Sequence, residues 1–173
     1  MSYAFATERL AACEWHVTEH RGEVADLPAA VATMLTEPVT LWLPPSWQGP
    51  YTRARAAAWI EERDAEGPVL LVVDRETRSP VGLVLLFEEP DDDGIDVRLG
   101  YLLAEEAWGR GLGSELLGGI VAWCRGRPEV RSIVGGVARE NTASIRLLER
   151  HGFGTDAAAE ADGEIVYRLR LLS

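Results

Sequence analysis

The chain has 173 residues, of which 17 are basic and 28 acidic, so its formal net charge is −11. Every basic side chain is Arg, because the sequence contains no Lys. A surface of this charge repels phosphate backbones, which argues against general nucleic-acid binding, and it mildly favours cationic partners such as amines. With 47% hydrophobic residues, the chain can bury a sizeable core, and we expect a single domain over residues 1–173.

The cysteines and the apolar segments exclude further classes of protein. Cys13 and Cys124 are too few for a disulfide framework and lack the spacing of metal ligands, so no metal site is expected. No apolar run reaches the roughly 18 residues that a membrane span needs. Glu8, Arg9 and Glu14 interrupt the N-terminal stretch, which is unlike a signal peptide. We therefore expect a cytoplasmic protein without a membrane partner.

The first part of the chain is predicted to contain one strand and two helices. Residues 7–17 have the pattern of a strand. Asp26 is a good helix N-cap, and apolar residues recur at helical spacing behind it until Pro38, which predicts a stop. Residues 41–50 are too rich in Pro and Gly for regular structure. A second helix is expected from Thr52 to about Gly67.

The rest of the chain changes to short apolar runs. Three of them follow one another without an intervening helix and are predicted as antiparallel strands, at residues 68–74, 81–87 and 95–103. An acidic loop is expected from Glu88 to Asp93. A helix, a strand, a helix and a strand then follow, at residues 109–123, 130–137, 142–150 and 164–171. The order β-α-α-β-β-β-α-β-α-β indicates an α/β (α+β) fold with a mixed sheet covered by helices.

The stretch Trp108-Gly-Arg-Gly-Leu-Gly113 joins an expected strand to an expected helix. Its three glycines allow tight turns and close approach of a ligand, and the first helical turn offers unpaired N–H groups to a pyrophosphate. An ordinary strand-to-helix turn explains this stretch equally well when it is taken alone. A Walker loop is excluded because Lys is missing, and a Rossmann fingerprint fits poorly because position 114 is Ser.

A second group of polar residues follows about thirty residues later. Asn141 stands where a strand gives way to a helix, Ser144 lies one turn further, and Gly152 is placed to end that helix. A helix cap and a Gly-Phe exit account for these residues structurally. The two groups in this order are much harder to explain by local structure alone.

Together these residues resemble the GCN5-related N-acetyltransferase (GNAT) superfamily, and most closely its branch of ribosomal-protein N-terminal acetyltransferases. The matching pieces are Leu99-Gly-Tyr101, Trp108-Gly-Arg-Gly-Leu-Gly113 and Asn141-x-x-Ser-x-Arg-Leu-Leu-Glu-x-x-Gly-Phe153. The resemblance covers nearly the whole chain and implies a single-domain GNAT fold. In that fold two central parallel strands, here residues 95–103 and 130–137, splay apart around acetyl-CoA.

The resemblance also implies which residues hold the acetyl-CoA co-substrate. The pantetheine arm would pair with the main chain at Leu102 and Leu103, and a backbone N–H near Leu103 would polarise the thioester carbonyl. Asn141 would hydrogen-bond the pantetheine arm, and Ser144 would lie close to the sulfur. The full predicted set is Leu102, Leu103, Trp108, Gly109, Arg110, Gly111, Leu112, Gly113, Ser114, Asn141 and Ser144, with the pyrophosphate on the N–H groups of residues 110–114.

Acetyl transfer to an amine needs a general acid for the departing thiolate. Many relatives place a Tyr seven residues after the Asn for this purpose, but that position here is Leu148. Ser144 is the expected substitute, with Tyr101 behind it. Ser144 also fits a capping role in the first helical turn, and Tyr101 also fits a packed strand position.

The general base is less well defined by the sequence. Glu88 is the first candidate, with Glu89 and Asp96 beside it, because these residues end one central strand and begin the next. The same acidic run is also typical of a solvated loop. Gly136 stands where some relatives carry a base.

The acceptor is expected to be a primary amine, either a small molecule or a protein N-terminus. Four aromatic residues would line its pocket, with Trp59 in the core and Trp47 exposed to substrate: Trp42, Trp47, Tyr51 and Trp59. A non-catalytic acyl-CoA-binding module with a regulatory role is the alternative, since Leu148 replaces the usual acid. The histidines have no metal or nucleophile pattern, and a homodimer is compatible with the sequence.

Overall fold

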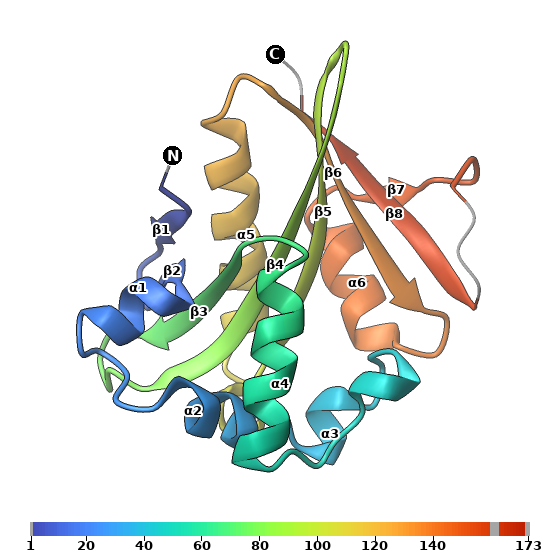
Figure 1. Cartoon of the computed structure of the whole chain (residues 1–173). Coiled ribbons are helices and arrows are strands. Elements are labelled where there is room, and N and C mark those ends of the chain that lie inside the picture. The colour runs from blue at the N-terminus through green and yellow to red at the C-terminus, as the bar shows by residue number, and fades with distance from the viewer. Residues whose placement is uncertain (1, 160–162, 172–173) are drawn as a thin grey trace.

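One eight-stranded sheet runs through the computed structural model, which describes residues 2–159 and 163–171 (Figure 1). The strand order is β1-β2-β3-β4-β5-β6-β8-β7, and every neighbouring pair is antiparallel except β5 and β6. The strands are β1 (Ala4–Ala6), β2 (Leu10–Glu14), β3 (Val69–Asp74), β4 (Pro80–Asp91), β5 (Gly94–Leu103), β6 (Val130–Ala138), β7 (Gly154–Thr155) and β8 (Glu164–Arg170). The mixed sheet predicted from the sequence is confirmed.

Helices cover both faces of this sheet (Figure 1). They are α1 (Trp15–His20), α2 (Leu27–Met34), α3 (Glu37–Thr40), α4 (Arg53–Asp64), α5 (Leu112–Arg125) and α6 (Thr142–Arg150), with 3₁₀ turns at Pro45–Trp47 and Glu105–Ala107. The predicted caps are present, since Asp26 accepts from the N–H of Ala29 at 2.9 Å and Thr52 accepts from the N–H of Arg55 at 3.1 Å. None of the helices among the described residues is long and apolar enough to cross a membrane.

Each face of the sheet has its own hydrophobic core. On β4, Val84 and Leu86 pack in the core beneath α5 and α6, whereas Leu83 and Leu85 pack in the core beneath α1, α2 and α4. This alternation follows the two-residue period of a strand. Because both faces are covered, β3 and the first part of β4 appear in the sequence as continuous apolar runs.

The N-terminal strand is shorter than predicted. β2 ends at Glu14, and α1 begins at Trp15, so the prediction of a strand up to residue 17 was wrong. The helical turn buries the Trp15 ring, which is 1% exposed, and brings its Nε1 within 2.9 Å of Asp64 Oδ1 on α4. Residues 15–17 are therefore helical and contact α4, although their local sequence pattern favoured a strand.

Two further boundaries differ from the prediction. α2 ends at Met34, and Pro38 lies in the first turn of α3, where a missing N–H breaks no helical hydrogen bond. The predicted acidic loop is largely strand, because β4 continues to Asp91 and pairs with β5 up to Gly94. Arginines on neighbouring elements compensate the carboxylates there, as Arg98 does for Glu89 at 2.8 Å.

The two parallel strands separate halfway along their length. β5 and β6 pair only over residues 95–98 and 130–134; further on, β5 stays with β4 and β6 stays with β8. The splayed strands implied by the family resemblance are therefore present.

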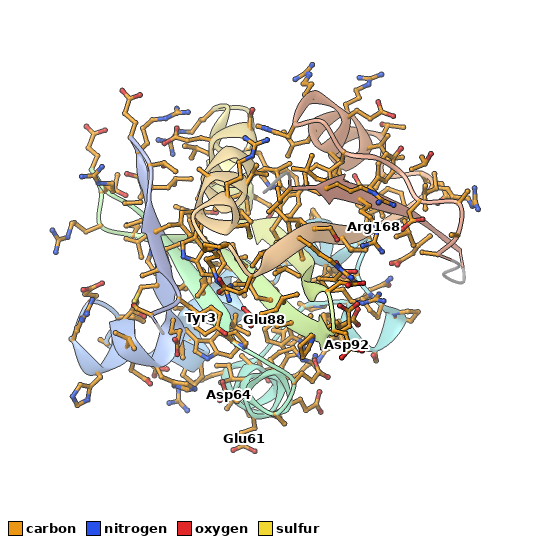
Figure 2. The ribbon with its side chains drawn as sticks, turned by 90° about the horizontal axis from the view of Figure 1, so that it is seen from above. Tyr3, Glu61, Asp64, Glu88, Asp92 and Arg168 are labelled. Carbon is orange, nitrogen blue, oxygen red and sulfur yellow. The ribbon has the colours of Figure 1, made fainter. Side chains whose placement is uncertain are left out.

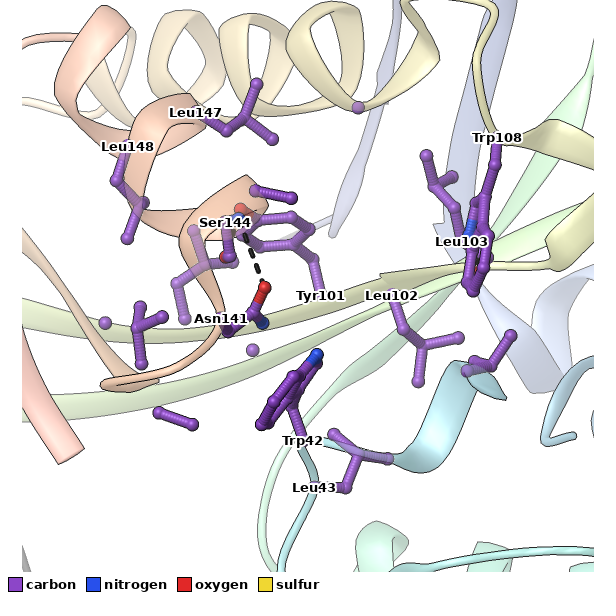
Figure 3. Close-up of a pocket in the computed structure, with 18 of the residues that line it drawn as sticks. Trp42, Leu43, Tyr101, Leu102, Leu103, Trp108, Asn141, Ser144, Leu147 and Leu148 are labelled. Atoms are coloured by element: carbon purple, nitrogen blue, oxygen red, sulfur yellow. Dashed lines mark hydrogen bonds between the residues drawn. The ribbon is translucent and has the colours of Figure 1, made fainter. Parts of the chain in front are cut away.

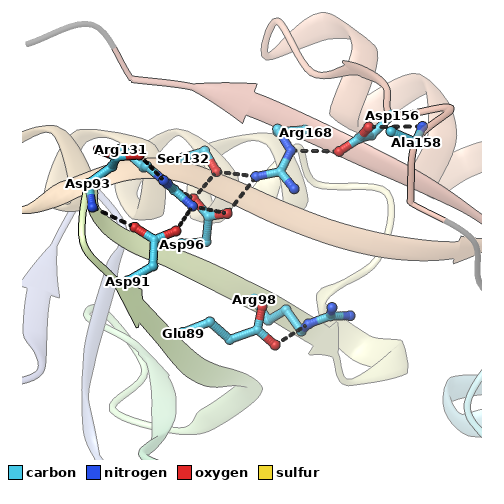
Figure 4. Close-up of polar contacts among 10 residues, drawn as sticks. All are labelled: Glu89, Asp91, Asp93, Asp96, Arg98, Arg131, Ser132, Asp156, Ala158 and Arg168. Atoms are coloured by element: carbon cyan, nitrogen blue, oxygen red, sulfur yellow. Dashed lines mark hydrogen bonds and ion pairs between the residues drawn. The ribbon is translucent and has the colours of Figure 1, made fainter.

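A polar network joins the three strands at the paired end (Figure 4). The Asp96 carboxylate on β5 accepts hydrogen bonds from Arg131 Nε at 2.7 Å, from Ser132 Oγ at 2.7 Å and from Arg168 Nη1 at 2.8 Å. The hydrogen bond from Arg131 is the strongest influence, and together these partners hold the pKa of Asp96 far below its usual range. The network fastens β5, β6 and β8 together just before β5 and β6 diverge.

Candidate active site

A cavity of about 690 Å³ lies between the diverging ends of β5 and β6 (Figure 3). Its walls come from six segments of the chain. They are the segment from α3 to the following 3₁₀ turn, the end of β5, the glycine loop before α5, the end of β6, the start of α6 and the start of β8. The volume is within the range usual for a small-molecule site.

The end of β5 presents an unpaired backbone edge to this cavity. Ala104 donates to the Val81 carbonyl, so by the alternation of an antiparallel ladder the N–H and C=O groups of Leu102 and Gly100 face β4. Those of Tyr101 and Leu103 face the side from which β6 has departed. Main-chain pairing with a ligand, predicted for Leu102 and Leu103, is thus open to Leu103 and Tyr101, while Leu102 lines the cavity with its side chain.

Trp108 lies directly beside this edge. Its indole Nε1 donates to the Leu103 carbonyl at 2.9 Å, and the residue is 49% exposed (Figure 3). The side chain therefore covers one of the polar groups of the free edge.

The glycine loop bends sharply into α5. Gly109 and Gly111 have φ values of 70° and 74°, a region that favours glycine, and Gly111 is the N-cap of the helix. A Cβ at Gly113 would lie 3.3 Å from Leu147 Cδ2, so this position keeps α5 and α6 close together. The first-turn N–H groups of α5 are thereby brought to the cavity.

Two members of the predicted cofactor set turn their side chains elsewhere. Arg110 Nη2 contacts Asp74 at 3.2 Å, and its carbonyl accepts from Arg9. Ser114 Oγ lies 3.0 Å from His151 Nε2. Neither residue lines the cavity, so any contact they make with a ligand there must come from their backbone N–H groups. The other nine residues of the predicted cofactor set all line it.

Two hydroxyl groups meet at the inner wall of the cavity (Figure 3). Tyr101 Oη on β5 and Ser144 Oγ on α6 are 3.0 Å apart. Burial raises the pKa of Tyr101, against an opposing effect of the Ser144 hydrogen bond, so the phenol keeps its proton at neutral pH. Asn141 Oδ1 caps α6 by accepting from the Ser144 N–H at 3.2 Å, which leaves its Nδ2 amide as a donor.

Glu88, the first predicted base, lies away from these groups. Its Oε1 is 2.6 Å from Arg127 Nη1, near Tyr3 and the C-terminal end of α5 (Figure 2). Glu89 pairs with Arg98, and Asp96 is held in its network. The structure thus places Glu88 outside the cavity, because Glu88 pairs with Val97 in the part of β5 that is still paired with β6.

Glu164 is the acidic residue that the sequence reasoning missed. It opens β8 opposite Ala138, lines the cavity, and lies over Gly136, where a Cβ would overlap its Oε2. It is the one carboxylate among the described residues that line the cavity. The missing side chain at Gly136 was the available signal, since it leaves room for an acid from the neighbouring strand.

A smaller cavity of about 180 Å³ adjoins the first on the sheet face beneath α4. Gly136, Glu164 and the middle of β5 line both. Of the four predicted aromatics, Trp42 and Trp47 line the larger cavity, and Trp47 and Trp59 line the smaller. Trp59 is 4% exposed, which confirms its core position, and Tyr51 lines neither.

The comparison with protein families decides the class. The family described as acetyltransferase (GNAT) domain matches residues 18–154. The chain belongs to the GNAT family. It is thus an N-acetyltransferase by family, as the sequence motifs predicted. No curated protein is significantly similar in sequence.

Solved structures share the fold at low sequence identity. A GNAT-family acetyltransferase from Bacillus anthracis has a TM-score of 0.74 at 16% identity, over 96% of this chain and 98% of that one. The ribosomal-protein-S5-alanine acetyltransferase from Vibrio fischeri has a TM-score of 0.63 at 16% identity, over 97% and 96%. A spermidine N-acetyltransferase from Vibrio cholerae, solved with CoA and spermine, has a TM-score of 0.68 at 16% identity, over 94% and 96%.

Proposed function

We propose that this GNAT protein transfers an acetyl group from acetyl-CoA directly to a primary amine. One observation carries the proposal: a free strand edge, a helix N-terminus, a hydroxyl pair and the Glu164 carboxylate all line one cavity. These are the groups needed to hold an acyl-CoA and to move the two protons of the reaction.

The residues of the cavity fit acetyl-CoA, which would supply the activated acetyl group. Tyr101 and Leu103 offer backbone groups to an extended amide chain, and Asn141 offers its Nδ2. The N–H groups at the start of α5 suit a pyrophosphate, because that end of the helix carries unpaired donors and positive dipole charge. The Leu103 N–H is a preorganised donor for a carbonyl that gains negative charge.

Two proton transfers are assigned to named side chains. Glu164 accepts the proton that the amine must lose, since it supplies the carboxylate among the described residues that line the cavity. Ser144 gives a proton to the departing thiolate, and Tyr101 donates to the Ser144 oxygen across 3.0 Å. Solvent then restores both groups. Leu148, at the position where many relatives place the acid, is buried and contributes an apolar side chain to the cavity wall.

The first test follows CoA thiol release from acetyl-CoA in the presence of simple amines, amino acids, polyamines, aminoglycosides and N-terminal peptides. Amine-dependent release is the expected result. Acetyl-CoA binding is measured separately, by thermal shift. Binding without release in any amine would overturn the proposal and favour the non-catalytic acyl-CoA-binding module.

Three substitutions test the proton assignments. Glu164→Gln and Ser144→Ala should each lower kcat by about 10²-fold or more, and Tyr101→Phe should lower it less, because it acts on Ser144 rather than on the substrate. Glu76→Gln, on the exposed turn between β3 and β4, is the matched control and should leave kcat unchanged. A loss below about tenfold in Glu164→Gln would remove Glu164 from the role of base.

A further inference from the structure

The smaller cavity has a mostly apolar wall. It lies where a substituent of an amine held at Glu164 would extend, because Glu164 and Gly136 belong to both cavities. Aliphatic and aromatic side chains make up most of its surface, from Leu85, Phe87, Val134, Val166, Trp47 and Trp59. Apolar surface of this kind favours an apolar group over a hydrated one.

The aromatic part of this wall is held in place by its neighbours. Trp59 packs edge-on against Trp47 and Trp15, with ring centroids 5.5 and 6.1 Å away. Arg63 is 4% exposed and lies with its guanidinium 4.0 Å above the centre of the Trp47 ring. The wall is thus preformed rather than assembled around a ligand.

The charges of the smaller cavity favour a single ammonium group. Only two of its described lining residues are charged, Glu164 and Arg98. The Arg98 guanidinium is paired with Glu89 at 2.8 Å, and its positive charge would lie near a second ammonium on the same ligand. The acidic net charge of the whole chain therefore does not extend to this cavity.

The size of the cavity limits the substituent. A volume of about 180 Å³ corresponds to roughly six water molecules at about 30 Å³ each. It accommodates a branched aliphatic chain or one aromatic ring.

We propose that the acceptor is a monoamine with a compact apolar substituent, and that the Trp47–Trp59 wall holds this substituent while Glu164 receives the amine. The inference rests on the proposed acetyl transfer. The same chemistry is found in a free amine and in an N-terminal residue with an apolar side chain, so the test includes both sources.

The experiment compares kcat/KM for 2-phenylethylamine and isopentylamine with kcat/KM for ethanolamine and spermidine. We expect kcat/KM for each apolar amine to be at least tenfold higher than for ethanolamine and for spermidine, because an apolar pocket binds an apolar substituent more tightly than a polar one. Tripeptide amides that begin with Phe or with Ser form the second arm. A higher kcat/KM for the Phe peptide than for 2-phenylethylamine assigns the source to N-termini, and the reverse assigns it to free amines.

Matched tryptophan variants tie the selectivity to the cavity. Trp47→Ala should reduce the ratio of 2-phenylethylamine to ethanolamine at least tenfold. Trp123→Ala removes a partly buried tryptophan of α5 that lines neither cavity, and should leave this ratio within about threefold. Both variants are checked for folding by their thermal transitions.

The possible results distinguish the acceptor preference from acetyl transfer itself. Equal or faster turnover of spermidine or ethanolamine would overturn the inference and leave acetyl transfer standing. An unchanged ratio in Trp47→Ala would overturn the role of the wall. Absence of release with every amine would overturn the proposed function, and the inference with it.

Discussion

His151 lies against the first two turns of α5, with its Nε2 3.0 Å from the Ser114 hydroxyl oxygen. Burial lowers the pKa of His151 from its ordinary value of 6.5. The unfolded chain therefore binds a proton at a higher pH than the folded protein does, and the free energy of unfolding falls as the pH is lowered through 6.5 toward the folded-state pKa.

Replacing this histidine should remove that part of the pH dependence. We expect the melting temperature of the wild type to fall between pH 7.5 and pH 5.5, and that of His151→Gln to fall less, since each unit of pKa difference corresponds to about 1.4 kcal/mol. Thermal unfolding at a series of pH values is the measurement. Parallel curves for the two proteins would contradict the assignment, and His20→Gln is the control.

The individual site residues were predictable to different degrees. Asn141, Ser144 and Tyr101 belong to motifs with fixed spacing, and the structure brings them together. Glu164 belongs to no such motif, because its place depends on the pairing of β8 with β6. Glu88 was a candidate by its proximity in sequence to a central strand, and the register of that strand carries it to the opposite end.

The Asp96 network should stabilise the paired end of β5 and β6, and this can be tested by substitution. Asp96→Asn leaves Arg131 and Arg168 without their shared carboxylate charge, in a region where Asp96 itself is 9% exposed. We expect a loss of about 2–3 kcal/mol in the free energy of unfolding, less than for a fully buried pair because both arginines are partly solvated.

Urea unfolding measures this loss, and Glu89→Gln is the matched control. The Glu89–Arg98 pair is more than half exposed on both sides, so its removal should cost less than about 1 kcal/mol. Equal losses in the two variants would show that the Asp96 network has no special role in joining the strands.

Elements with a clear period were predicted well, and boundaries set by tertiary contacts were not. Residues 112–125 and 142–150 form the expected helices because each has one apolar stripe. α1 was missed because the burial of Trp15 against α4 does not appear in local periodicity. The divergence of β5 from β6 was implied by the family resemblance alone, since local sequence pattern does not show where two paired strands separate.

Binding of acetyl-CoA should be visible in the stability of the whole molecule. At a concentration of about 100 times Kd, a ligand of the folded state adds about 2.7 kcal/mol, which for a chain of this length is a rise of roughly 5–10 °C in melting temperature. Gly111→Ala strains a backbone at φ 74° and displaces the start of α5.

We therefore expect Gly111→Ala to lower the melting temperature of the free protein and to reduce the acetyl-CoA shift as well. Gly22→Ala is the control, because Gly22 has a similar φ of 71° but lies far from the cavity. It should lower the melting temperature and keep the full shift. A full shift in Gly111→Ala, or a shift with NADH and none with acetyl-CoA, would contradict the assignment of the glycine loop.

The free edge of β5 also affects how readily this protein aggregates. Unpaired strand edges are templates on which other chains add strands, and they promote aggregation. The groups of Tyr101 and Leu103 form such an edge in the interior of the sheet, and the Trp108 indole already occupies the Leu103 carbonyl. α6 and the segment after α3 flank the opening, so an incoming strand meets side chains before it meets backbone. The bulky frame of the cleft thus protects the sheet from edge-to-edge association.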